Sequence, residues 1–424
     1  MAALTPEACH SILQGVVGSE ADQSLVPSLE NLTDENWALL TRAAIRSRLA
    51  HPFRQYLRAH SASGLVVPPV CLGRLDRVMQ RTMMANLKQQ GVFRKMAEAC
   101  DAQGIEFMMV KGLWLAETIY QDMSARRSGD IDLLLKPEDM PRFTAMVAGM
   151  GYDVPAGVTD IREIAPGAKE HAITELRTGA YIDVHWSLVD TPEQLAVSEE
   201  TFWLHSEVQR IAGRRCRSLC LEDHLLYLAF HAAILHRFIY VGPRAFMDIA
   251  QMIRTPIRPM DWDFLTQRAL ALGWSRSVWL VFEIARTHFG AAVPLHVLKV
   301  MEPPEATSAP ETMAIIQQAA LFNIWENQNS RESWALTFWT RILLHKTGVE
   351  RVRFVFRSFF PSSAYLKGYF KASQPKAGVQ LQRAKRLRVM VKEKRDSVQR
   401  FFFFVIRRRK DLSGVAVLTE WLNS

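Results

Sequence analysis

The sequence of 424 residues contains no pattern typical of a secretory signal or of a membrane span. Its first twenty residues have no basic stretch before a continuous apolar core, so they do not match a secretory signal. The longest charge-free runs, such as Thr312 to Trp325, are shorter than the roughly 18 to 20 apolar residues that cross a bilayer. We therefore expect a cytoplasmic protein.

Cysteine is also scarce, and its placement argues against a structural zinc site. The five cysteines are scattered, and only Cys216 and Cys220 lie close together in sequence. A structural zinc site would need a second pair of ligands beside them, which the sequence does not offer. Free thiols in a reducing compartment are the expected state.

Charge is unevenly distributed along the chain. Residues 341–424 contain 20 Lys and Arg against 5 Asp and Glu, whereas the first 340 residues contain 32 against 38. From Arg383 to Arg409 the basic residues alternate with apolar ones, and Phe401 to Phe404 form an aromatic block. A basic amphipathic helix there could bind RNA or an anionic membrane surface such as the inner face of the membrane, or pack its apolar side on the body. Charge alone leaves these alternatives open.

Apolar residues make up 49% of the chain, enough for several cores, and the patterns predict four regions. Residues 1–71 are expected to be helical and to end in a linker rich in Gly and Pro. Residues 72–215 mix helices and strands, residues 216–340 are helical, and residues 341–424 form the basic tail. The fold class predicted is α+β, with a small mixed β-sheet flanked by N-terminal helices and a C-terminal helical domain.

The element order within 72–215 follows from periodicity and from breaking residues. A long amphipathic helix is expected from Leu72 to Ala102 and a short one from Leu113 to Tyr120, with a third at Pro141 to Met150. Strands are expected at Ile105–Val110, Asp130–Leu135, His171–Leu176 and Tyr181–Leu188. From Leu221 onward the pattern is helical, with segments at Glu222–Leu235, Ala245–Ile253 and Asp261–Phe289.

Two carboxylates share one face of a predicted strand. Side chains alternate along a strand, so Asp130 and Asp132 point one way while Ile131 and Leu133 point the other. Neighbouring carboxylates repel each other unless a divalent cation lies between them, and Mg²⁺ prefers oxygen ligands of this kind. A solvated strand end is the alternative for an isolated pair.

Two further features favour the metal site. The Lys111-Gly112 turn precedes a helix and offers backbone N–H groups, a close approach and a positive charge, all suited to phosphate. Asp183 lies on another predicted strand and would supply a third carboxylate. His185 shares the face of Asp183, where it could contact substrate or serve as a hydrogen-bonded structural residue.

These motifs resemble an uncharacterised bacterial nucleotidyltransferase family of the DNA polymerase beta superfamily. The resemblance is carried by Val110 to Ala116, Tyr120, Arg127, Asp130 to Leu134, Gly151-Tyr152 and Ile182 to Trp186, and it continues through Glu222 to Leu226, His231, Arg244 and Asp248 to Ala250. The superfamily usually has Gly-Gly or Gly-Ser where this chain has Lys111-Gly112. The resemblance covers about residues 72–300.

The resemblance implies an enzyme that transfers a nucleoside monophosphate from a nucleoside triphosphate such as ATP to an unidentified acceptor. Asp130, Asp132 and Asp183 would be catalytic and would bind Mg²⁺, with two ions expected. Lys111 and Gly112 would contact the triphosphate, and Arg127 would contact phosphate or substrate. His231, Arg244 and Asp248 could line the nucleotide cleft or fix helix packing.

Two alternatives stay open. Toxin-like transferases that add nucleotides to tRNA share a similar arrangement of Lys-Gly and Arg-x-x-Asp-x-Asp, and the basic tail suits RNA. A non-catalytic nucleotide-binding scaffold is the other, although it would have no need for all three carboxylates.

Overall fold

A computed structural model describes residues 4–18, 23–61, 64–164, 168–326 and 409–423. The chain divides into two compact units, one of residues Met1–Leu235 with Gly242–Pro303 and one of His236–Val241 with Pro304–Ser424. The predicted amphipathic segment at 383–409 lies almost entirely outside the described residues. No helix in the described ranges is long and apolar enough to span a bilayer.

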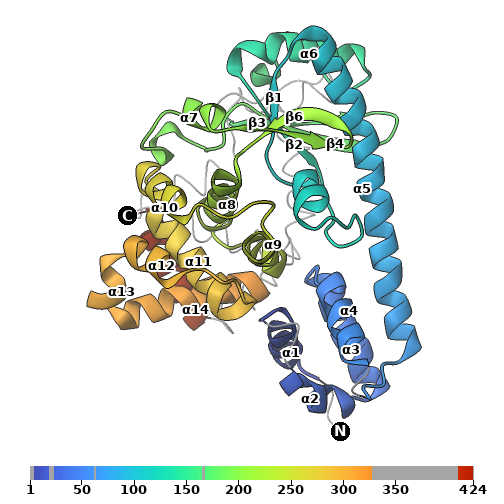
Figure 1. Cartoon of the computed structure of the whole chain (residues 1–424), viewed down its shortest axis with the longest axis vertical. Coiled ribbons are helices and arrows are strands. Elements are labelled where there is room, and N and C mark those ends of the chain that lie inside the picture. Colours follow the sequence, from blue (N-terminus) through green and yellow to red (C-terminus); the bar gives the residue numbers. More distant parts are fainter. Residues whose placement is uncertain (1–3, 19–22, 62–63, 165–167, 327–408, 424) are drawn as a thin grey trace, which may run out of the picture. The chain divides into compact units, whose positions relative to one another are not determined.

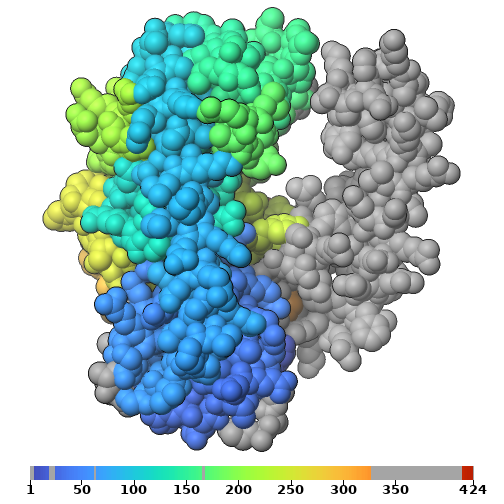
Figure 2. Space-filling model, turned by 90° about the vertical axis from the view of Figure 1, so that its right-hand side faces the viewer, coloured from blue at the N-terminus to red at the C-terminus, as the bar shows by residue number. Residues whose placement is uncertain are grey.

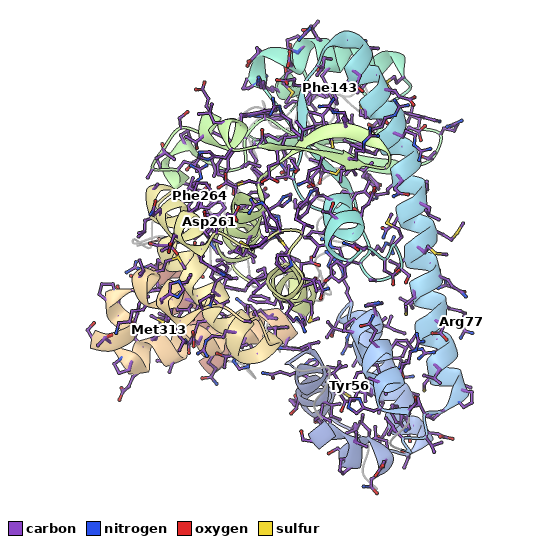
Figure 3. The ribbon with its side chains drawn as sticks, in the orientation of Figure 1. Tyr56, Arg77, Phe143, Asp261, Phe264 and Met313 are labelled. Carbon is purple, nitrogen blue, oxygen red and sulfur yellow. The ribbon has the colours of Figure 1, made fainter. Side chains whose placement is uncertain are left out.

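The first unit begins with a group of short helices. Thr33 caps α3 by accepting a hydrogen bond from the Asn36 amide, and Asp34 and Glu35 occupy the first turn, where the helix dipole favours negative charge. Tyr56 of α4 is fully buried among these helices (Figure 3). The elements are α1 (Pro6–Gly18), η1 (Gln23–Leu25), α2 (Val26–Glu30), α3 (Asp34–Arg46) and α4 (Ala50–Ala59).

Helix α5 (Pro69–Gln103) joins this group to the sheet, confirming the helix predicted at 72–102. It begins with proline in its first turn and ends at Gly104, whose positive φ of 62° closes the helix. Figure 1 shows it running from the N-terminal helices to the strands, and in Figure 2 its blue residues lie along the side that faces the viewer. Exposed Arg77 projects from its outer side (Figure 3).

A six-stranded mixed sheet in the order β3-β4-β2-β1-β6-β5 forms the centre of this unit, as the α+β prediction requires. β2 runs parallel to β4 and β1 parallel to β6, while the pairs β1/β2, β3/β4 and β5/β6 are antiparallel. The strands are β1 (Phe107–Met109), β2 (Ile131–Leu135), β3 (Glu170–Glu175), β4 (Ala180–His185), β5 (Glu207–Ile211) and β6 (Arg214–Ser218).

The hairpin β5–β6 was not predicted from the sequence. Ile211 pairs with Arg214, and the two residues between them, Ala212 and Gly213, both have positive φ, of 48° and 78°. A two-residue hairpin turn of this kind normally carries Asn-Gly or Asp-Gly, so alanine conceals the signal. β6 is also unusually basic for a strand that lies between two others.

The two faces of the sheet differ in character. Phe93 of α5 packs edge-on against Phe107 of β1, with 5.9 Å between ring centroids, and Phe107 is paired with Leu135. Alternation along β2 therefore directs Leu135, Leu133 and Ile131 toward α5 and Asp132 toward the opposite face. The apolar face anchors the sheet, while the other face holds charged groups.

The remaining elements of the first unit surround and follow the sheet. The predicted helix at 261–289 is in fact two helices, because Gly273, with φ of 76°, separates them. The elements are η3 (Leu115–Ile119), η4 (Pro137–Asp139), α6 (Met140–Gly149), η5 (Ile161–Glu163), η6 (Pro192–Gln194), α7 (Glu200–Leu204), α8 (Leu221–Phe230), η7 (His231–Leu235), α9 (Gly242–Arg254), α10 (Trp262–Ala271), α11 (Ser275–Phe289) and α12 (Leu295–Met301).

The second unit contains α13 (Pro304–Ser308), α14 (Pro310–Glu326) and α19 (Arg409–Asn423). α14 and α19 pack closely at Gly414, where an added Cβ would lie 3.4 Å from the Ala319 side chain. Val415 and Leu418 of α19 are buried. Helices far apart in sequence thus share one small core.

Candidate active site

Three carboxylates meet on the charged face of the sheet. The parallel pairing of β2 with β4 places Asp132 directly beside Asp183, and Asp130 precedes Asp132 by two residues. One carboxylate oxygen of each residue lies within 4.8 Å of those of the other two. Asp132 is buried, and Asp130 and Asp183 are partly exposed. The three residues predicted from separate stretches therefore do come together.

A chain of charged contacts surrounds Asp132. Its Oδ1 lies 2.9 Å from Lys111 Nζ and 3.2 Å from His185 Nε2. On its other side, His185 Nδ1 lies 2.8 Å from Glu170 Oε2, and Lys111 Nζ lies 3.2 Å from His231 Nε2. His185 is thus clamped between two carboxylates, and Lys111 is the cation that neutralises Asp132.

The carboxyl groups have divergent acidities. Burial alone would raise the pKa of Asp132, but Lys111 and His185 outweigh that effect and hold it below its ordinary value. Burial, together with the charges of Asp132 and Asp130, raises the pKa of Asp183 to about 7. The Asp132 charge and burial also raise the pKa of Asp130. Asp132 is therefore held in its charged form. A bound cation would most strongly stabilise the charged forms of Asp130 and Asp183.

One oxygen of Asp132 has no partner. Its Oδ2 is buried and makes no hydrogen bond within the described chain. Buried carboxylate oxygens are nearly always satisfied, so an orphan beside two further carboxylates indicates a ligand. The residues present fit a hard divalent cation, which takes oxygen ligands.

The Lys111-Gly112 turn lies directly against this centre. Gly112 has a positive φ of 47°, and a Cβ there would lie 2.9 Å from Ser128 Oγ, 3.0 Å from the Asp130 carbonyl oxygen and 3.2 Å from Asp132 Oδ2. Only glycine combines this backbone conformation with so little space. The turn thereby brings the backbone against the start of β2.

Arg126, which no sequence motif singled out, fixes the turn from the other side. It is buried, donates to the Gly112 carbonyl at 2.8 Å and pairs with Asp248 at 3.0 Å. Tyr120 also donates to Asp248, at 2.9 Å. Asp248 of α9 therefore serves helix packing and turn position, one of the two roles expected for it. The sequence alone could not distinguish Arg126 from the adjacent Arg127, because the motif does not show which of the two arginines is buried.

The loop that carries Arg127 is fastened to α5. The buried Asn86 donates to the carbonyls of Met123 and Arg126, each at 2.8 Å, and accepts from the Ser128 amide at 2.9 Å. Arg127 itself is exposed, and Arg244 donates to its carbonyl at 2.8 Å. Arg127, Arg244 and Asp130 all line one cleft of about 690 Å³.

Other residues of the predicted motifs have structural partners. Glu222 pairs with Arg258 at 2.6 Å, and Asp223 pairs with Arg268 at 2.8 Å. His224 stacks on Trp114 with 3.8 Å between ring centroids. All five cysteines are buried as free thiols.

Comparison with known proteins gives one match. A family model described as an uncharacterised nucleotidyltransferase matches residues 33–290, more than half of the chain. The match begins at Thr33, the N-cap of α3, well before the segment that the motifs alone had indicated. Searches of curated proteins and of solved structures give no match.

Proposed function

The chain belongs to the uncharacterised nucleotidyltransferase family, and from that membership we propose that it moves a nucleoside monophosphate from a triphosphate such as ATP to an acceptor, with two magnesium ions held by Asp130, Asp132 and Asp183. Pyrophosphate would be the leaving product. The likeness to the DNA polymerase beta superfamily is part of this proposal.

The observation that carries the proposal is the meeting of three carboxylates around the unpartnered Oδ2 of Asp132. No other group of three potential ligands gathers in this way within the described residues. Mg²⁺ bound there would stabilise the charge that develops on the transferred phosphoryl group and its leaving group.

The side chains of the chain itself have distinct tasks in this proposal. Asp183, which lies beside the cation that would activate the acceptor, assists removal of the acceptor proton. Lys111 and Gly112 face the triphosphate, and the contact of Lys111 with Asp132 keeps that carboxylate charged and oriented. Arg127 contacts phosphate. His185, tied to Glu170 and Asp132, positions the latter.

A label on the α-phosphate tests the transfer. The purified chain is incubated with Mg²⁺, each α-labelled triphosphate in turn, and separate pools of metabolites and RNA. We expect α-label in an acceptor and release of unlabelled pyrophosphate. A parallel reaction with γ-label must leave the acceptor unlabelled, because phosphoryl transfer would label it instead.

Asp132→Asn and Asp263→Asn form a matched pair for this assay. Asp263 is an exposed residue of α10 remote in sequence from the three carboxylates. Asp132→Asn should abolish labelling while Asp263→Asn retains it. Equal labelling by both would contradict the proposal, and label found in tRNA would identify the RNA-directed version of the activity.

A further inference from the structure

An unassigned cleft reaches the carboxylate centre from the side of Asp130. Its walls come from the end of α3, the start of α4, the first half of α5, the loop before β2 and the start of α9. Its volume of about 690 Å³ lies in the range of ligand sites. The polar side chains in its lining are Arg46, Arg48, His51, Arg81, Thr82, Ser124, Arg127, Asp130 and Arg244.

The charge of this cleft is one-sided. Five arginines line it, and Asp130 is the single carboxylate among the lining residues. The structure shows no ion pair for Arg46, Arg48, Arg81 or Arg127 with any described residue. Some other arginines of the same unit are paired, as Arg54 is with Asp76 at 2.8 Å, and others that form no ion pair with a described residue, such as Arg42 and Arg77, lie outside the cleft. What distinguishes this cleft is that five guanidinium groups line it together with a single carboxylate.

Arg244, another residue of the lining, shows the same imbalance. Its Nε is buried and has no hydrogen-bond partner in the described part of the chain. Burial and the neighbouring charge of Arg126 lower its pKa to about 10. A nearby anion would strongly stabilise the charged guanidinium in these surroundings. Its planar arrangement of N–H donors also matches the oxygen atoms of a phosphate.

The lining of the cleft does not include the Lys111-Gly112 turn. Gly129 and Asp130 belong to its lining, whereas Lys111, Gly112, Asp132 and Asp183 do not. In an in-line displacement the attacking and leaving groups lie on opposite sides of the transferred phosphorus. With the leaving pyrophosphate at the Lys111-Gly112 turn, a phosphate in the arginine cleft belongs to the attacking molecule.

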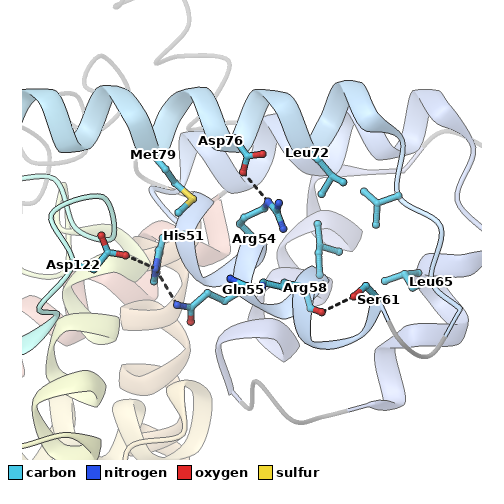
Figure 4. A pocket seen from close by; sticks show the side chains of 12 residues that line it. His51, Arg54, Gln55, Arg58, Ser61, Leu65, Leu72, Asp76, Met79 and Asp122 are labelled. Carbon is cyan, nitrogen blue, oxygen red and sulfur yellow. Dashed lines mark hydrogen bonds and ion pairs between the residues drawn. The ribbon is translucent and has the colours of Figure 1, made fainter.

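A second hollow of about 650 Å³ adjoins the cleft, because His51 and Met79 line both. Figure 4 shows His51 between Asp122 and Gln55, with the Arg54–Asp76 ion pair farther along. His51 Nε2 lies 3.6 Å from Asp122 Oδ2. Leu57, Leu65 and Leu72 supply apolar wall here. The two hollows together have space for a ligand larger than one phosphate group. The hollow at His51 is lined by fewer charged side chains than the arginine cleft.

We propose that the arginine cleft binds a phosphate group of the acceptor, so that the acceptor is a phosphorylated molecule whose remainder extends toward the hollow at His51. This inference rests on the proposed nucleotidyl transfer for its direction. The same chemistry could come from a small sugar phosphate or from the phosphodiester next to the 3′ end of an RNA.

The test compares three probes on three forms of the full chain. The probes are ribose 5-phosphate, a short single-stranded RNA with a free 3′-hydroxyl, and a non-hydrolysable ATP analogue with Mg²⁺. The forms are wild type, the double variant Arg46→Gln/Arg48→Gln, and the control Arg42→Gln. Arg42 is an exposed arginine one turn before Arg46 on α3 and does not line the cleft.

Calorimetry should show that wild type binds at least one of the two acceptor probes. The double variant should bind that probe about tenfold more weakly or worse, while its affinity for the ATP analogue changes by less than about threefold. The control should match wild type. The probe that binds identifies the source of the phosphate.

Three results would overturn the proposal: neither acceptor probe binds, the double variant binds it as well as wild type does, or the ATP analogue loses as much affinity as the acceptor probe. Failure of the proposed transfer reads out separately, because a chain without transferase activity would still bind the acceptor probe through its arginines. Unfolding temperatures of all three forms exclude a folding defect.

Discussion

Two clusters of charged residues in the first unit are arranged in opposite ways. At the start of α8, Glu222 and Asp223 are each matched by an arginine, Arg258 and Arg268. Around Asp130 the carboxylates crowd together, and the arginines of the cleft form no direct ion pair with a described carboxylate. In the matched cluster, at the start of α8, every carboxylate has an arginine partner, and these ion pairs stabilise the fold. In the unmatched cluster, around Asp130, the charges remain available to a ligand. Variants in the two clusters should therefore affect different properties.

The largest effect is expected at the unmatched cluster. Asp132→Asn keeps the size of the side chain but removes the charge that a cation needs, so transfer should fall about 1,000-fold, or roughly 4 kcal/mol. The rate of α-label incorporation measures this. Circular dichroism must show a folded variant, and transfer within about threefold of wild type would remove the distinction between the clusters.

The matched cluster should respond in stability instead. Asp223→Ala leaves the buried Arg268 without its carboxylate, which costs about 3 kcal/mol of unfolding free energy. Denaturant unfolding measures the loss. The transfer rate per folded molecule should stay near that of wild type. A variant that keeps its stability but loses transfer activity would contradict the assignment of Asp223 to the matched cluster.

Gly112→Ala tests how tightly the turn is fitted to the carboxylates. Its positive φ and the oxygen atoms of Ser128 and Asp130 near the added Cβ should cost about 2 kcal/mol and displace Asp132. Gly91→Ala is the matched control, since it lies within α5 with open space around it and should be neutral or stabilising by about 0.5 kcal/mol. The melting temperature and the rate of label incorporation are measured for both variants. Equal values for Gly112→Ala and Gly91→Ala would contradict the close fit of the turn to the carboxylates.

The smallest effect concerns pH. The pKa of Asp183 is raised from its ordinary value to about 7, so its cost to folding grows as pH rises from about 4 to about 7 and is fully present above that. In a chelator at about pH 8, Asp183→Asn should therefore raise stability by roughly 1 kcal/mol, after allowance for solvent screening, and the gain should shrink toward about pH 5. Mg²⁺ should raise the melting temperature of wild type more than that of the variant. A gain that grows at acidic pH would contradict the sign.

Local patterns predicted much of this arrangement. The α5 periodicity gave its ends to within a turn, and the alternation in β2 placed Asp130 and Asp132 on one face. The position of Asp183 beside Asp132 depends on which strands pair, which no local pattern encodes. The roles of Arg126, Glu170 and Arg48 escaped for the same reason, because their surroundings come from distant parts of the chain. The β5–β6 hairpin escaped because Ala212 occupies a turn position usually held by asparagine or aspartate.

The parallel alignment of Asp132 with Asp183 also constrains how such a chain can vary. Length changes between β2 and β4 can be absorbed in the connecting segments so long as the two strands stay in step. A slip of a single residue would turn Asp183 to the apolar side and bring Ile182 or Val184 into its place. Mutational tolerance should thus be wide in the connections and almost nil in the spacing of the strand itself.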